Sequence, residues 1–156
     1  TQLRPPQLSD LGLEAALRGE IEQLAGTASI PLRLEPLAQE PDEETALACF
    51  RTVQQALAHA FRHAPDSRIQ LVLADAGDDQ FSLSLLDEGD AFATGKEAPG
   101  FDLPLLHERA RALGGQLQTG TSDDGSRLCL RLPYRAAGHA SVDLQQPGAR
   151  SGSSFA

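Results

Sequence analysis

Three acidic residues that could bind a cation, Asp87, Glu88 and Asp90, lie close together in the middle of the chain. Carboxylates are oxygen ligands of the kind that Ca²⁺ and Mg²⁺ prefer. The calcium loop D-x-D-x-D-G with its distant Glu is missing, which argues against a calcium site. The same residues also fit a solvated acidic turn, and the sequence by itself leaves that interpretation open.

Histidines supply the other groups that could do chemistry. His59 and His63 lie four positions apart, and His107 lies farther along the chain. His59 fits either a ligand position or a packed or capping histidine, whereas His63 and His107 are expected to be surface or structural residues. The motifs G-x-S-x-G and H-E-x-x-H and the P-loop are missing, so the enzyme classes that depend on them are not indicated.

Composition narrows the function classes further. The chain has 156 residues, 40% of them apolar, and a formal net charge of -9, which fits one soluble domain. The acidic balance argues against binding to nucleic acid or to an anionic membrane, because Lys and Arg hold those partners. The sequence has no apolar run of about 18 residues and no signal peptide, so it predicts no membrane contact by this segment. A cytoplasmic location is expected, including the cytoplasmic part of a membrane sensor.

Apolar periodicity and turn residues predict the elements that must position these groups. Helical spacing predicts helices over residues 10–25, 41–64 and 103–113, and alternation predicts strands over 30–34, 69–73, 81–85, 116–120 and 126–132. The last four strands form two hairpins, and Pro31 favours an edge position for the first strand. This order predicts an α+β fold, a two-layer sandwich whose mixed, mostly antiparallel sheet carries its helices on one face.

Five stretches of the sequence carry a resemblance to a known family. They read FRTVQQALAHAFRHA (50–64), LLDEGDAF (85–92), PGFDL (99–103), HERARALGGQL (107–117) and DDGSRLCLRLP (123–133). In this order and spacing they resemble the ATP-binding domain, of the GHKL or Bergerat type, of two-component sensor histidine kinases. We therefore expect a linker or the end of a preceding helix in residues 1–9, the ATPase-like domain in 10–134 and a disordered tail in 135–156. Because the chain begins at Thr1 and contains no Met, we expect it to be a piece of a longer protein.

The resemblance implies a shelf for the adenine of ATP. In the family an Asp in a D-x-G-x-G motif accepts a hydrogen bond from the exocyclic amine of the base. Asp87 and Gly89 match this motif, and Ala91 replaces its second glycine. Ser126 lies where the family usually has a Thr that supports the base.

The resemblance also implies a magnesium site, and here the sequence departs from the family. The long helix of the family carries E-x-x-x-N, with both side chains on one face because residues four apart lie one turn above the other. The corresponding residues are Gln55, which replaces the catalytic Glu, and His59, which replaces the Asn that binds the metal. An imidazole is a poor substitute for the amide oxygen, because Mg²⁺ prefers hard oxygen ligands.

The phosphate-binding part is changed as well. The glycine pair of the family lid corresponds to Gly100 and Asp102, and Asp102 brings a negative charge toward the expected triphosphate. Arg62 and His63 match the pair of a basic residue and a histidine that closes the long-helix motif in the family. Some attraction for phosphate is therefore expected to persist.

The resemblance implies phosphoryl transfer from ATP, with Mg²⁺, to a histidine on a preceding dimerisation and phosphoacceptor domain. Because Gln55, His59, Ala91 and Asp102 fall on metal and nucleotide contacts, we predict weak or absent ATP binding and little kinase activity. The alternative is a non-catalytic interaction domain that keeps the fold to dock another kinase or a response regulator. A third interpretation is that His59 admits a different metal or ligand.

Overall fold

The computed structural model describes residues 6–25, 30–66, 68–93 and 100–137, without the side chains of residues 6–11 and 25. Most of the predicted segments 1–9 and 135–156 lie outside these residues. None of the helices that the structure describes combines the length and apolar character needed to span a bilayer.

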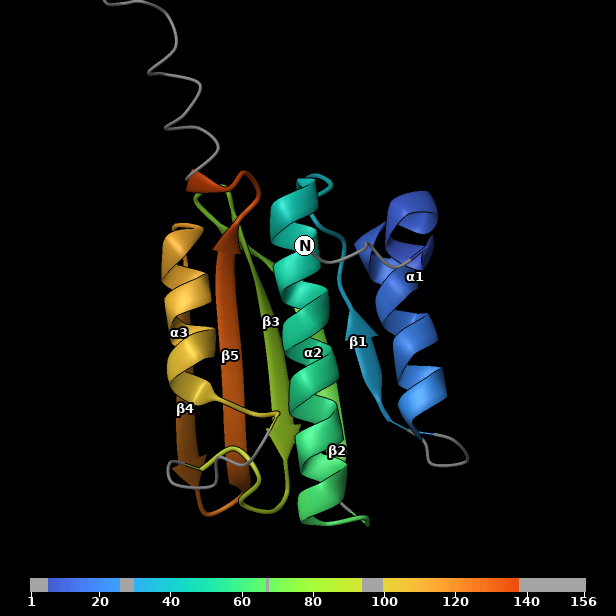
Figure 1. The fold of residues 1–156 in the computed structure, drawn as a ribbon, viewed down its shortest axis with the longest axis vertical. Coiled ribbons are helices and arrows are strands. Elements are labelled where there is room, and N and C mark those ends of the chain that lie inside the picture. The colour runs from blue at the N-terminus through green and yellow to red at the C-terminus, as the bar shows by residue number, and fades with distance from the viewer. Residues whose placement is uncertain (1–5, 26–29, 67, 94–99, 138–156) are drawn as a thin grey trace, which may run out of the picture.

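A five-stranded sheet forms one layer of the described chain, in the order β1-β2-β3-β5-β4 (Figure 1). The strands are β1 (Leu32–Leu34), β2 (Ile69–Gly77), β3 (Gln80–Asp87), β4 (Gln116–Ser122) and β5 (Gly125–Pro133). β1 pairs parallel with β2, and all other neighbouring strands pair antiparallel. The two predicted hairpins and the edge position of the strand after Pro31 are confirmed.

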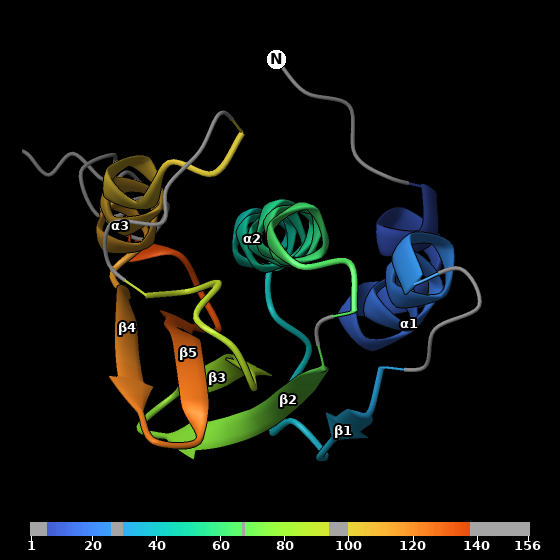
Figure 2. The ribbon, with the colours of Figure 1, turned by 90° about the horizontal axis from the view of Figure 1, so that it is seen from below.

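Three helices in the described chain form the second layer: α1 (Pro6–Ala25), α2 (Glu43–His63) and α3 (Leu103–Ala112). Figure 2 shows all of them on the same face of the sheet, with α2 between α1 and α3. The predicted α+β two-layer sandwich is therefore confirmed. Gly12 interrupts the helical backbone of α1 with a φ of 88°, a conformation that glycine adopts without strain.

The sequence of α2 explains both its ends and its buried face. The Asp42 side chain accepts a hydrogen bond of 2.9 Å from the backbone N–H of Thr45, and Glu43 and Glu44 follow in the positive first turn of the helix. The helix stops at His63 because Pro65 disfavours a helical conformation for Ala64, which is extended. A stripe of buried side chains, which includes Phe50, Val53 and Leu57, packs into the core. The same helix thereby carries His59 to the end of β3.

Tyr134 fastens the end of β5 to the rest of the fold. Its hydroxyl donates a hydrogen bond of 2.5 Å to Oδ1 of Asp75 and accepts one of 3.1 Å from the backbone N–H of Ala38. Burial, and then the hydrogen bond to Asp75, raise the pKa of Tyr134 above its ordinary value. The hydrogen bond from Tyr134 is the main cause that lowers the pKa of Asp75. Ala136, just beyond Tyr134, is fully buried as well.

The raised pKa predicts how stability depends on alkaline pH. A group whose pKa is higher in the folded state contributes stability below its unfolded pKa, near 10.0 for Tyr, and loses that contribution as the pH rises through the folded value. We expect Tyr134→Phe to lower the free energy of unfolding at pH 7 by about 1 to 2 kcal/mol and to remove this alkaline component. Urea unfolding at pH 7, 10 and 11 measures both effects.

The chain contains one Tyr, so absorbance of the phenolate reports this residue alone. We expect its titration midpoint to lie above pH 10 in the folded protein and close to 10 in denaturant. Equal midpoints in the two states contradict the assignment.

Candidate functional site

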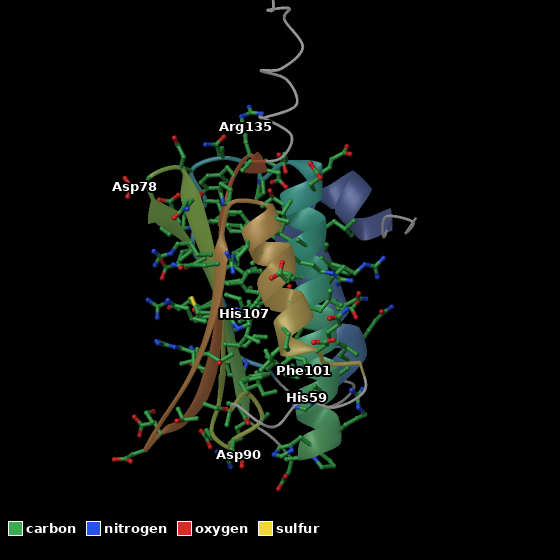
Figure 3. All side chains as sticks on the ribbon, turned by 60° about the vertical axis from the view of Figure 1, so that its left-hand side comes forward. His59, Asp78, Asp90, Phe101, His107 and Arg135 are labelled. Carbon is green, nitrogen blue, oxygen red and sulfur yellow. The ribbon has the colours of Figure 1, made fainter. Side chains whose placement is uncertain are left out.

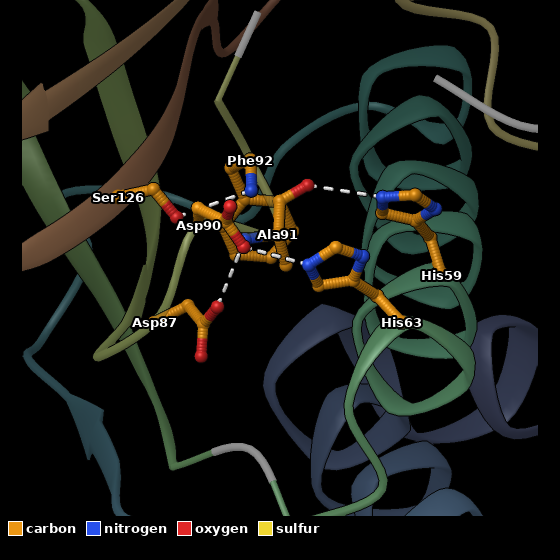
Figure 4. Close-up of polar contacts among 7 residues, drawn as sticks. All are labelled: His59, His63, Asp87, Asp90, Ala91, Phe92 and Ser126. Carbon is orange, nitrogen blue, oxygen red and sulfur yellow. Dashed lines mark hydrogen bonds and ion pairs between the residues drawn. The ribbon is translucent and has the colours of Figure 1, made fainter. Parts of the chain in front are cut away.

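Asp87, the last residue of β3, lies in the protein interior with 3% of its surface exposed. Its Oδ2 accepts a hydrogen bond of 3.1 Å from the backbone N–H of Ala91, which holds the loop after β3 in a tight turn (Figure 4). Its Oδ1 is buried and has no hydrogen-bond partner among the described residues. A buried acceptor without a partner is costly, so this atom is suited to a donor from a ligand. The solvated-turn interpretation fits the exposed Glu88 and Asp90 and is wrong for Asp87.

Ser126 and Gly125, at the start of β5, form the wall beside Asp87. The hydroxyl of Ser126 accepts a hydrogen bond of 3.1 Å from the backbone N–H of Phe92, so it helps to fix the same loop. Gly125 has a φ of 136°, and a Cβ built there would lie 2.0 Å from the carbonyl oxygen of Asp87. β3 and β5 thus approach too closely for any side chain at position 125. Asp87 and Ser126 also border a cavity of about 870 Å³ at this end of the sheet.

His59 faces this loop from α2. It is 3% exposed, and its Nε2 lies 3.0 Å from the carbonyl oxygen of Ala91 (Figure 4). Because a carbonyl oxygen only accepts hydrogen bonds, Nε2 carries the proton and donates it. The expected metal position is therefore taken by a packed histidine that links α2 to the loop. Gln55 lies one helical turn earlier on α2 and is half-buried.

An aromatic ring covers His59 from the side of α3. Phe101 is fully buried, and its ring stacks on the His59 imidazole with the centroids 4.2 Å apart and the planes 12° from parallel (Figure 3). Phe92 lies against the same ring at a centroid distance of 6.3 Å. Sequence reasoning singled out Gly100 and Asp102 and missed the role of Phe101. The sequence did contain a signal for this role, since Phe101 is an aromatic residue inside a polar stretch without periodicity, and such a residue is expected to be buried.

Asp102 occupies the N-terminus of α3. Its Oδ1 accepts a hydrogen bond of 3.1 Å from the backbone N–H of Leu105, so the carboxylate caps the helix. The N–H groups of a helix N-terminus are a common binding site for phosphate. In this chain the carboxylate takes one of those donors and adds a negative charge at the same place.

The two remaining predicted residues lie at the C-terminal end of α2. Nε2 of His63 forms a hydrogen bond of 2.6 Å with Oδ1 of Asp90, which joins the end of the helix to the loop after β3. Arg62 reaches the turn before α3, because a Cβ at Gly100 would lie 3.6 Å from its Nη2. The structure therefore brings the predicted residues of three separate segments to one place.

This place does not form a metal centre by itself. Among the residues that the structure describes, no group of three or more His, Cys, Asp and Glu side chains is arranged to hold a metal ion. At this place the buried side chains of His59 and Ser126 form hydrogen bonds with backbone groups, the exposed carboxylate of Asp102 caps α3, and Oδ1 of Asp87 has no partner among the described residues.

The chain is similar in sequence to sensor histidine kinases. It is 32% identical over 139 residues to the signal transduction histidine-protein kinase/phosphatase UhpB of Salmonella typhimurium, a match that covers 86% of this chain and 27% of UhpB. It is 28% identical to the oxygen sensor histidine kinase NreB of Staphylococcus carnosus, over 85% of this chain and 39% of NreB. The chain thus spans less than half the length of these relatives. No protein-family model matches it.

Solved structures share the fold. The blue-light activated histidine kinase of Erythrobacter litoralis matches with a TM-score of 0.63 and 17% identity, over 87% of this chain and 45% of that protein. The histidine kinase domain of the Escherichia coli osmosensor EnvZ matches with a TM-score of 0.53 and 19% identity, over 78% of this chain and 85% of that domain. Both matches extend over most of the described chain.

Proposed function

We propose that this chain is an ATP-binding-type domain like those of the sensor histidine kinases to which it is similar, and that it is a degenerate member with weak or no binding of magnesium-ATP. In the whole protein it would follow a dimerisation and phosphoacceptor domain, whose histidine receives the γ-phosphoryl group in an active relative. The observation that carries the proposal is the packing of His59, which replaces the expected metal ligand with a buried, stacked imidazole.

The base-binding part fits an adenine. Oδ1 of Asp87 is a buried acceptor without a partner, and the exocyclic amine of adenine is a donor that would satisfy it. Ser126 supports the loop beside it, and Gly89 leaves room on the other side, since a Cβ there would lie 3.3 Å from Oδ2 of Asp87. ShkA, a fold neighbour with a TM-score of 0.57, has been crystallised with the ATP analogue AMPPNP. This part alone therefore supports a residual affinity for the base.

The metal and phosphate parts do not fit. His59 already donates from Nε2 to Ala91 and stacks on Phe101, and imidazole is a poor ligand for Mg²⁺. The carboxylate of Asp102 lies at the N-terminus of α3, where it would repel a phosphate that approaches the same N–H groups. We therefore assign no catalytic step to Mg²⁺-ATP in this chain.

A second function has support from the same contacts. The stack of Phe101 on His59 and the hydrogen bond between His63 and Asp90 join α2 to the turn before α3 and to the loop after β3. A domain whose loops are fixed to α2 by its own side chains is suited to docking another kinase or a response regulator. Nucleotide binding separates the two functions.

Calorimetric titration of the unmodified chain with ATP and Mg²⁺ tests the proposal. We expect a Kd no tighter than about 1 mM, and binding at least about tenfold tighter by the double variant His59→Asn, Asp102→Gly. This variant restores an amide oxygen and frees the N–H groups of α3, while Gly remains an adequate helix cap.

The matched control is the double variant His107→Asn, Asp123→Gly, which makes the same chemical changes outside the site and should bind no better than the parent. Tight magnesium-dependent binding by the unmodified chain contradicts the degenerate assignment. Failure of the restored variant, with its fold intact by circular dichroism, leaves the docking function as the better account.

A further inference from the structure

An apolar groove of about 380 Å³ lies between α2 and α3, away from the site described above. Figure 2 shows these helices side by side over the sheet, and β5 supplies the floor of the groove. Its apolar lining includes Leu47 of α2, Leu106 of α3, the α3 C-cap Leu113, and Leu130 and Leu132 of β5. The side chains of Arg51, Arg109 and Glu44 also line it, so the groove combines an apolar floor with a small net positive charge.

The chain itself leads to one end of this groove. The backbone N–H of Ala136 donates a hydrogen bond of 2.8 Å to Oδ2 of Asp42, the cap of α2. The backbone N–H of Ala137 donates one of 3.0 Å to the carbonyl oxygen of Leu113, at the end of α3. These contacts hold the last described residues between the two helices that form the walls, at the end of the molecule where Figure 3 labels Arg135.

The sequence that follows complements the groove. Val142 and Leu144 flank Asp143, so in an extended chain two apolar side chains would share one face and the acid would lie on the other. Val142 lies five positions after Ala137, a stretch that spans up to about 17 Å when extended, whereas the stretch from Leu106 of α3 to its C-cap Leu113 is about 10 Å long. The segment is long enough to reach along the groove without disturbing its anchor.

We propose that residues 138–144 of the same chain occupy the groove between α2 and α3, with Val142 and Leu144 on its apolar floor and Asp143 beside Arg109. The tether at Ala137 makes this contact intramolecular, so a short segment of modest intrinsic affinity is held at a high effective concentration. The groove reaches along α2 as far as Thr52, which precedes His59 on the same helix. A segment in the groove would cover this side of the helix pair and block the approach of another protein to it, whether or not the chain binds a nucleotide.

Hydrogen exchange of the full chain tests this proposal. We expect Val142→Asp, Leu144→Asp to speed exchange of the amides near the end of α3 about tenfold. The control Ser151→Asp, Ser153→Asp adds the same charge at the same spacing later in the chain and should leave these rates unchanged. Equal rates in both variants and the parent overturn the proposal.

A charge exchange identifies the partner of Asp143. Arg109→Glu and Asp143→Arg should each speed exchange about threefold, and the two together should return the rates to those of the parent. If the double variant loses as much protection from exchange as the two single variants together, the assignment of Asp143 to Arg109 is overturned. All rates should be the same at protein concentrations tenfold apart. Protection that grows with concentration assigns the groove to a second copy of the chain and overturns occupation within one chain.

Discussion

Gly125→Ala is expected to lower the free energy of unfolding by about 3 kcal/mol or more. The added Cβ would lie 2.0 Å from the carbonyl oxygen of Asp87 and 2.9 Å from Cα of Glu88, and both contacts are with backbone. The backbone cannot yield cheaply, because Asp87 pairs with Ser126 across β3 and β5 and with Ile69 across β2 and β3. The φ of 136° adds strain for any residue with a side chain. Urea unfolding of parent and variant measures the loss.

Gly120→Ala is the matched control, because it also lies in the hairpin of β4 and β5 and a Cβ there meets nothing within 4 Å. Its free energy of unfolding should stay within about 0.5 kcal/mol of the parent. If both variants lose a similar free energy of unfolding, the close approach of β5 to Asp87 is not the cause, and the hairpin is sensitive to an added side chain for another reason.

The layers of the fold were predictable because each depends on local patterns. Alternating apolar residues identify β2, β3 and β5, and a single apolar stripe with acidic residues at its start identifies α2. Pro31 correctly indicated an edge strand, and β1 is shorter than expected, at Leu32–Leu34. The parallel pairing of β1 with β2 could not be read in this way, since it depends on where the chain returns after α1 and α2.

The site was predictable as a set of positions and not as a set of contacts. The resemblance predicted one region for His59, Asp87 and Asp102; in the structure His59 and Asp87 both contact Ala91, and Phe101, next to Asp102, stacks on His59. The sequence left two interpretations of His59 open, and in the structure the residue is packed, because Phe101, distant in the chain, folds onto its ring. Likewise Asp102 was expected to face a phosphate, whereas its carboxylate finds a nearer donor in its own helix. Such local satisfaction of polar groups depends on rotamers that spacing does not encode.

Phe101→Ala is expected to lower the free energy of unfolding by about 3 to 4 kcal/mol, because it empties a fully buried aromatic site. Part of this loss comes from the stack of Phe101 on His59. Stacked ring pairs of this kind stabilise a protein by about 0.5 to 1.5 kcal/mol. The double variant His59→Ala, Phe101→Ala should therefore lose about 1 kcal/mol less than the sum of the single variants. The pair Leu17→Ala, Phe101→Ala should be additive, since Leu17 lies on α1, on the far side of α2 (Figure 2).

The same variant separates the two barriers to nucleotide binding. Removal of the Phe101 ring makes room beside His59 but leaves that residue without a suitable metal oxygen and leaves Asp102 at the N-terminus of α3. If charge and ligand chemistry are the barrier, Phe101→Ala should bind magnesium-ATP no better than the parent in calorimetry, whereas His59→Asn, Asp102→Gly should gain about tenfold. Tight binding by Phe101→Ala alone would instead make the buried ring the barrier. The site would then be an occluded nucleotide pocket rather than a degenerate one.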